Sequence, residues 1–174
     1  MACALTQGYN LDCRNSVAGI KEVHIIEFDS ITAITFAAGV TTLITKATGK
    51  KFFKYALIKQ TGSAEEQIMV NEENGTLHVQ QSIKFPTAKI QASVRNEIML
   101  LAQNRLMMVV VDNNGIGWLY GQTNAMLLNN GSKAMTGTKF GDRNGYELDF
   151  IGFEPNLAIQ VDPTTLLALE TAGV

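Results

Sequence analysis

The sequence has few of the residues from which most catalytic and metal sites are built. It contains two histidines, His24 and His78, and two cysteines, Cys3 and Cys13, among 174 residues. Neither histidine has a cysteine or a second histidine at a spacing typical of metal ligands. No serine lies in a Gly-x-Ser-x-Gly elbow, and no glycine-rich dinucleotide motif precedes a helix. The sequence therefore predicts that the protein is not an enzyme and has no catalytic, cofactor-binding or metal-binding residue.

The sequence also lacks the long apolar segments of membrane and secreted proteins. No apolar run reaches the length of about 18 residues that a membrane helix needs. The segment Met1 to Tyr9 has neither the basic start nor the apolar centre of a secretory signal. We therefore expect synthesis and folding in the cytoplasm, without a membrane partner. In that compartment Cys3 and Cys13 are more often reduced than bridged, but their pairing stays open.

Charge is scarce as well. Charged residues make up 17% of the chain and hydrophobic residues 46%, with a formal net charge of −2, whereas about a quarter of residues are charged in a typical protein. The small net charge gives no long-range attraction to nucleic acid or to an anionic membrane. So few surface charges favour self-association, and a moderately polar monomer is the alternative.

The most distinctive segment that is present is an apolar strand from Leu106 to Val111. A half-buried strand alternates apolar and polar residues, but every position here is apolar. Both faces of this strand should therefore be shielded from water. The helix expected just before it can cover one face, and the other face needs a second sheet or a neighbouring subunit.

The remaining patterns predict a β-rich fold with one long helix. Asn74-Gly75 between strand-forming residues indicates a hairpin, and Ile90, Val94, Ile98 and Leu101 recur at helical spacing. The prediction is a single domain over residues 1–174: a β-rich α+β sandwich or barrel of about eight to ten strands with one flanking helix. The expected segments are strands at 22–28, 31–36, 40–45, 52–60, 67–70, 76–85, 106–111, 117–121, 146–154 and 157–161, a helix at 88–103, a glycine-rich loop at 129–145, an N-terminal arm at 1–16 and a C-terminal arm at 163–174.

Three segments resemble a known family. They are Leu5 to Phe28 (LTQGYNLDCRNSVAGIKEVHIIEF), Leu100 to Gly115 (LLAQNRLMMVVVDNNG) and Phe140 to Phe150 (FGDRNGYELDF). They resemble the tail tube proteins of tailed bacteriophages that infect Bacteroidota. The resemblance spans nearly the whole chain, but it depends on strand and turn patterns and includes no catalytic motif.

The resemblance implies a virion structural protein of the phage tail. Tail tube proteins fold as a β-sandwich or barrel with a flanking helix, and they assemble into stacked, typically hexameric rings through which DNA is ejected. DNA would then be a transient cargo of the lumen, and a weakly charged wall would not hold it back. The partners would be copies of the same chain and other tail proteins, with the two arms and the loop at 129–145 contacting successive rings. The candidate assembly contacts are Leu106, Met108, Val110, Trp118, Phe140, Arg143 and Leu166.

Other functions stay open on the sequence alone. The chain could have another virion role, as a head decoration, as a neck or stopper ring, or as the tube of a phage-related injection machine. It could instead be a monomeric β module that binds carbohydrate or protein. A hydrolase using Glu147 and Asp149 is a further alternative, although strand faces commonly carry such carboxylate pairs. The sequence leaves open the ring symmetry, the residues that line the lumen, whether the tail contracts, and the host.

Overall fold

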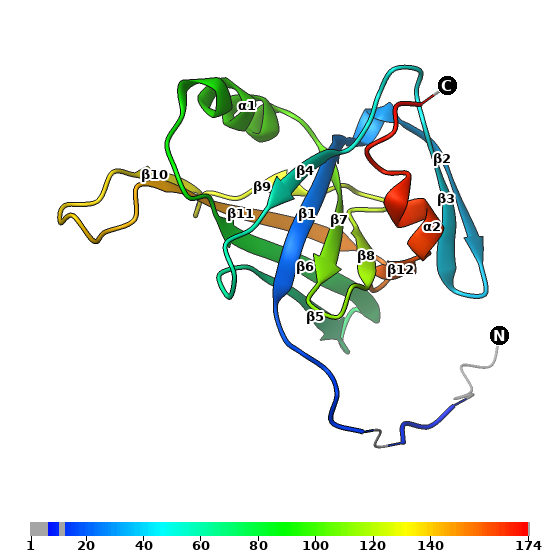
Figure 1. Cartoon of the computed structure of the whole chain (residues 1–174). Helices are drawn as coiled ribbons and strands as arrows, with labels where there is room; N and C mark the ends of the chain where they lie inside the picture. The colour runs from blue at the N-terminus through cyan, green and yellow to red at the C-terminus, as the bar shows by residue number, and fades with distance from the viewer. Residues whose placement is uncertain (1–6, 11–12, 174) are drawn as a thin grey trace.

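The computed structural model describes residues 7–10 and 13–173 and contains two β-sheets, two α-helices and a short 3-10 helix, Phe28–Ser30 (Figure 1). The prediction of a β-rich fold with one long flanking helix is confirmed. The strands are β1 (Ile20–Glu27), β2 (Ile31–Ala37), β3 (Val40–Lys46), β4 (Phe53–Ala56), β5 (Ser63–Asn71), β6 (Thr76–Pro86), β7 (Leu106–Asp112), β8 (Gly117–Tyr120), β9 (Leu127–Leu128), β10 (Lys133–Met135), β11 (Gly145–Glu154) and β12 (Ile159–Val161), and the helices are α1 (Ala92–Gln103) and α2 (Pro163–Leu167).

The two sheets differ in size and connectivity. The seven-stranded sheet has the order β2-β3-β12-β8-β7-β1-β4, and only its β12–β3 pair is parallel. The five-stranded sheet has the order β10-β11-β6-β5, with β9 also paired to β11. Neither sheet closes on itself, so of the two predicted architectures the sandwich is present and the closed barrel is not. Open edges therefore remain at β2, β4, β5 and β10.

The central strand β7 is covered on both of its faces. Leu106, Met108 and Val110 pack into a core between the two sheets, together with Ile83 and Phe150 of the five-stranded sheet. The alternate residues of β7 face a second core on the other side of the seven-stranded sheet. That core comprises Met107, Val109, Ile26, Ile44, Phe52, Leu119, Val161 and Leu169. The prediction that both faces are buried is confirmed, and the protomer supplies both layers, so β7 does not need a neighbouring subunit.

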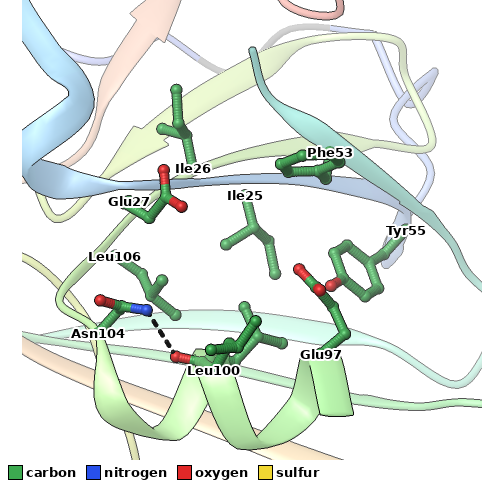
Figure 2. A pocket seen from close by; sticks show the side chains of 10 residues that line it. Ile25, Ile26, Glu27, Phe53, Tyr55, Glu97, Leu100, Asn104 and Leu106 are labelled. Carbon is green, nitrogen blue, oxygen red and sulfur yellow. Dashed lines mark hydrogen bonds between the residues drawn. The ribbon is translucent and has the colours of Figure 1, made fainter. Parts of the chain in front are cut away.

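Helix α1 begins at Ala92, four residues later than predicted, and lies at the margin of the core between the sheets. Leu101 is buried there, while Leu100 is half exposed. Figure 2 shows α1 beside β1 and β4, with Glu97 and Leu100 directed toward Ile25 and Tyr55. Burial and the nearby Glu97 carboxylate raise the pKa of Tyr55 to about 12. The helix closes the side of the sandwich, because the second sheet already covers the inner face of β7.

The C-terminal segment, predicted as an arm, is folded onto its own protomer. Leu169 is only 1% exposed and belongs to the second core. The Lys46 ammonium donates hydrogen bonds to the carbonyls of Ala168, Leu169 and Thr171 at 2.8, 3.2 and 2.7 Å. Gly173 then forms a parallel bridge with Thr48. In this position the segment covers the second core and does not extend toward another copy.

The described part of the N-terminal arm follows a different course. Residues 7–10 and 13–19 are exposed and lead away from β1 (Figure 1). The turn between β7 and β8 holds the end of the arm: Asn114 accepts the Val17 amide at 2.8 Å, and Asn113 donates to the Ala18 carbonyl at 2.7 Å. Cys3 lies outside the described residues, so its pairing with Cys13 stays open. Within the part of the chain that is described, no helix has the length and apolar character to cross a membrane.

Candidate assembly surfaces

Three of the predicted assembly contacts lie inside the protomer. Leu106, Met108 and Val110 are exposed by 2%, 0% and 1% respectively, because the five-stranded sheet covers their face of β7. They cannot contact another copy unless the two sheets separate. Their role here is to join the two sheets, so of the two roles expected for this strand, core or intersubunit strand, the structure shows the core, and these three residues are not contacts with neighbouring subunits.

Trp118 and Leu166 are only partly available to a partner. The Trp118 ring packs against the core between the sheets, and its Nε1 atom is 3.5 Å from Oδ2 of Asp112. Leu166 packs over β8, where a Cβ added to Gly117 would lie 3.1 Å from the leucine Cδ1 atom. Both side chains are half buried and mainly stabilise the protomer.

The loop that connects β10 to β11 presents Phe140 at the surface. This loop, residues 136–144, projects from the body of the protein (Figure 1), and Phe140 is fully exposed. The Asp142 carboxylate accepts the amides of Thr138 and Lys139 at 2.9 and 2.8 Å, and these hydrogen bonds lower the pKa of Asp142. The tip of the loop is therefore a defined turn that carries an uncovered aromatic ring.

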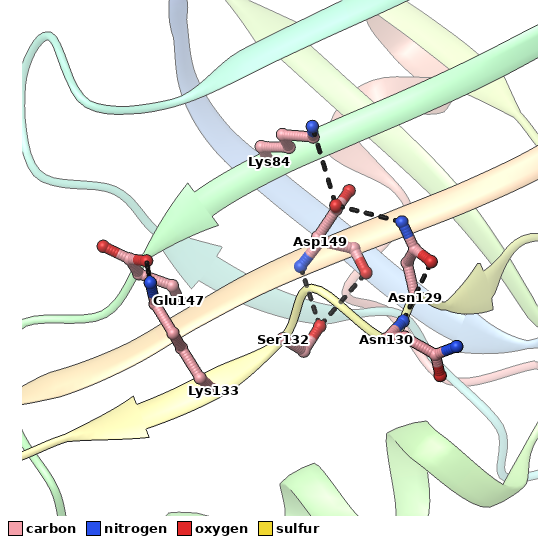
Figure 3. Close-up of polar contacts among 7 residues, drawn as sticks. All are labelled: Lys84, Asn129, Asn130, Ser132, Lys133, Glu147 and Asp149. Atoms are coloured by element: carbon pink, nitrogen blue, oxygen red, sulfur yellow. Dashed lines mark hydrogen bonds and ion pairs between the residues drawn. The ribbon is translucent and has the colours of Figure 1, made fainter.

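Polar contacts fix the base of the same loop to the five-stranded sheet (Figure 3). Nδ2 of Asn129 donates to Oδ2 of Asp149 at 3.1 Å, and the Ser132 hydroxyl accepts the Asp149 amide at 3.0 Å. Lys133 and Arg143 both contact the Glu147 carboxylate, at 3.1 and 3.2 Å. The predicted contact residue Arg143 is thus engaged within its own protomer. Because the carboxylates Glu147 and Asp149 anchor the loop, the structure gives them an architectural role.

An apolar strip at the other end of this sheet was missed by the sequence reasoning. Ile68, Val70 and Leu77 are 56%, 66% and 62% exposed. They lie on the face of the sheet that carries the buried Val79 and Ile83, since Ile68 pairs with Val79 and Val70 pairs with Leu77. The hairpin of β5 and β6 extends past the opposing sheet. The alternation in the sequence shows which face these residues share, but not where the opposing sheet ends.

The outer face of the five-stranded sheet has no covering layer within the described residues. Its residues Ser82, Gln80, Ile151 and Phe153 remain partly or largely exposed. Lys84 pairs with Asp149 on this face, at 3.6 Å, and the pairs made by Glu147 lie beside it. The charges on this face therefore largely compensate one another, which leaves no strong basic track.

The pocket beside α1 is small, and the larger hollows, of about 330–550 Å³, are more open to the surface. The pocket between α1 and the sheet margin (Figure 2) has a volume of about 90 Å³, whereas small-molecule sites typically measure about 300 Å³ or more. Among the described residues no three histidine, cysteine, aspartate or glutamate side chains lie close enough together to hold a metal ion.

One histidine is buried beside a group of charged side chains. His24 on β1 is 3% exposed, and its Nε2 atom is 3.6 Å from the Glu22 carboxylate. Glu22 in turn contacts the Lys54 ammonium at 2.9 Å, and Glu170 lies 3.9 Å from that ammonium. Burial lowers the pKa of His24, and the Glu22 carboxylate opposes this effect only in part.

The stability of the protein should therefore decrease in mild acid. The unfolded histidine has an ordinary pKa of 6.5 and the folded one a lower pKa, so the unfolded chain binds more protons as the pH falls through this range. As the pH falls from about 7.5 through 6.5, we expect the free energy of unfolding to decrease, and the decrease should continue until the folded histidine is protonated as well. In urea titrations, the free energy of unfolding should depend less on pH for His24→Gln than for the wild type. The pH dependence of the two proteins should differ least above about pH 7.5. Parallel profiles would contradict the assignment.

Comparisons with protein-family models, with curated proteins and with solved structures find no match to this chain.

Proposed function

We propose that the protein is a tail tube subunit of a bacteriophage virion, which self-assembles into stacked hexameric rings that form a conduit for DNA ejection. The observation that carries the proposal is the five-stranded sheet, whose two edges are open and whose outer face is uncovered and nearly self-neutralised. This sheet has the features required of a wall shared by several copies. The family itself comes from the resemblance of the three sequence segments.

The open edges provide a route to a closed ring. In one protomer, β5 forms one edge of the five-stranded sheet, and β9 and β10 form the other. Placing β5 of one copy beside β10 of the next would continue the sheet around a ring, which would remove exposed edges and close a barrel. The nine residues of β5, Ser63–Asn71, give this edge considerable length. The ring would thus satisfy backbone groups that are unpaired in the isolated protomer.

The charges of the outer face suit a lumen wall. Binding to DNA depends on lysine and arginine contacts with phosphates, and many such contacts would slow the passage of DNA. Here Lys84, Lys133 and Arg143 are each paired with a carboxylate of the same sheet. A wall with this pattern would hold DNA weakly while remaining wetted.

Electron microscopy of the purified protein tests the proposal. We expect negatively stained samples to show hollow rings or stacked tubes, and sedimentation to show particles much larger than the 18.9 kDa chain. Rings that never stack would favour a neck or stopper protein. A monomer that persists at every protein concentration would overturn the proposal and favour a binding module.

A further inference from the structure

We infer that successive rings join head to tail through the two ends of the five-stranded sheet. The loop at residues 136–144 of one copy would bind the apolar strip of Ile68, Val70 and Leu77 on a copy in the next ring. This inference rests on the proposed function and identifies the contact that stacks the rings. The occupant of the strip is thus a second copy of this chain.

The register of the strands places the two surfaces at opposite ends of one sheet. Strands β11 and β6 are antiparallel, and their pairing runs from Glu147 opposite Pro86 to Glu154 opposite Val79. The projecting loop directly precedes the first end of this ladder. The tip of the hairpin formed by β5 and β6 extends beyond the other end. If the sheet lines the ring, its two ends face the rings on either side.

The two ends are complementary in their apolar groups. Phe140 is a fully exposed aromatic ring on a turn that Asp142 holds in place. The strip offers three uncovered aliphatic side chains on one face of a strand pair. Aromatic anchors that are buried against apolar side chains contribute strongly to protein interfaces. Contact between the ring and the strip would remove both apolar surfaces from water.

The two ends are also complementary in charge. Glu72 and Glu73 lie at the exposed tip of the hairpin, and Lys139 lies beside Phe140 in the loop, where backbone amides bind the Asp142 carboxylate. None of these three side chains forms an ion pair within the described part of the protomer. Attraction between unlike ends and repulsion between like ends favour a head-to-tail arrangement. A contact of this type repeats without limit, as the growth of a tube requires.

Other segments are less suited to this contact. The C-terminal segment packs on its own protomer through Leu169 and Gly173. Leu167 on α2 is 85% exposed, but no unpaired lysine or arginine lies next to it in the sequence. Leu167 therefore provides a control position, because it is equally apolar and lies away from both ends of the five-stranded sheet.

The test uses two variants that each block one end. Phe140→Asp should disable the loop and Val70→Asp the strip, and both positions are exposed enough for the fold to persist. Each variant alone should require about tenfold more protein than the wild type to form stacks. The control Leu167→Asp should stack as the wild type does. Circular dichroism should give the same melting curve for all four proteins.

Mixing the two blocked variants tests the direction of the contact. Preformed particles of Phe140→Asp retain an intact strip, and those of Val70→Asp retain an intact loop. The mixture should therefore form pairs of particles, seen by electron microscopy and sedimentation, and nothing longer. Absence of pairs, or wild-type stacking by either variant alone, would overturn the inference.

A charge reversal gives an independent readout. Lys139→Glu should weaken stacking, and combining it in the same chain with Glu72→Lys and Glu73→Lys should restore stacking. Failure of this rescue would count against the charge pairing. Hollow tubes that form equally well with both blocked variants would overturn the contact and leave the proposed function standing. Open chains of protomers without hollow rings would support the contact and overturn the proposed function. A persistent monomer would overturn both the contact and the proposed function.

Discussion

Replacing Val109 with aspartate is expected to remove a large part of the protein's stability. Val109 is 0% exposed on β7, where it pairs with His24 on one side and Leu119 on the other. Its side chain faces the second core, whose other members are apolar. The only polar cross-strand neighbour of this position is the buried His24. A carboxylate held there costs about 3–5 kcal/mol, a large part of the roughly 5–15 kcal/mol by which proteins of this kind are stable. Urea unfolding followed by circular dichroism measures the loss.

A matched substitution on the surface provides the control. Val70 is also a valine within a strand, but it is 66% exposed. Val70→Asp should change the free energy of unfolding by no more than about 0.5 kcal/mol. The two variants have the same change of side chain, so their difference measures burial. Equal stabilities of the two variants would show that the second core, which covers one face of β7, does not form.

The burial of β7 illustrates what the sequence could predict. The uninterrupted apolar run from Leu106 to Val111 predicts two covered faces, and both are covered. The run carries no information about which layers provide the cover. One layer comes from the five-stranded sheet, and the other includes Leu169, which is far away in the sequence. Long-range packing of this kind depends on how the sheets curve and end, which a local pattern does not encode.

Local turn chemistry was predicted more successfully than strand length. Asn74-Gly75 lies in the hairpin turn between β5 and β6, as predicted, and Gly75 has a positive φ of 61°. The loop has four residues, 72–75, and Asn74 does not have a positive φ, so the turn is not the two-residue type that Asn-Gly favours. By contrast, the strand expected over residues 52–60 is shorter in the structure, where β4 extends only from Phe53 to Ala56. Gln60 has a φ of 62°, a left-handed conformation that is incompatible with a continuing strand. The alternation of residues there did not reveal this turn.

Gln81 is the one polar residue in the apolar pattern of β6, and its hydrogen bonds explain its position. It is 2% exposed on the inner face of β6, among Val79, Ile83 and Phe85. Its carbonyl oxygen accepts the Gly121 amide at 3.0 Å, and its amide nitrogen donates to the Glu66 carboxylate at 3.1 Å. Buried polar groups are stable when they are hydrogen bonded in this way. The sequence shows the exception, but its partners are distant in the chain and could not be predicted.

Local sequence patterns also could not show which candidate contacts lie at the surface and which lie in the core. Phe140 was predicted as a contact because it lies in a long glycine-rich loop, and loops lie at the surface; the structure places it there. Met108 was chosen because it is apolar, and an apolar residue in a strand can face either a partner or the protomer's own core. The exposed strip that includes Val70 resembles core positions in its alternation. Composition alone does not distinguish an uncovered apolar face from a covered one.

Replacing Gly145 with alanine is expected to displace the projecting loop and destabilise the protein. Gly145 begins β11, next to the chain that leaves β6, and an added Cβ would lie 2.0 Å from the Thr87 carbonyl oxygen. The neighbouring backbone is held by the hydrogen bond from the Thr87 amide to the Tyr146 carbonyl at 2.8 Å. The strands must therefore separate at the point where the loop departs. Overpacking of this type costs about 3 kcal/mol.

Gly141 is the matched control for this substitution. It lies in the same loop, and an added Cβ would have no atom within 4 Å. Gly141→Ala should therefore leave the free energy of unfolding within about 0.5 kcal/mol of the wild type. If the loop also joins the rings, Gly145→Ala should reduce stacking even in the fraction that stays folded, because the position of Phe140 depends on the base of the loop. A Gly145→Ala protein that is as stable as Gly141→Ala would show that β6 and β11 do not approach so closely, and would remove the basis for a loop of fixed direction.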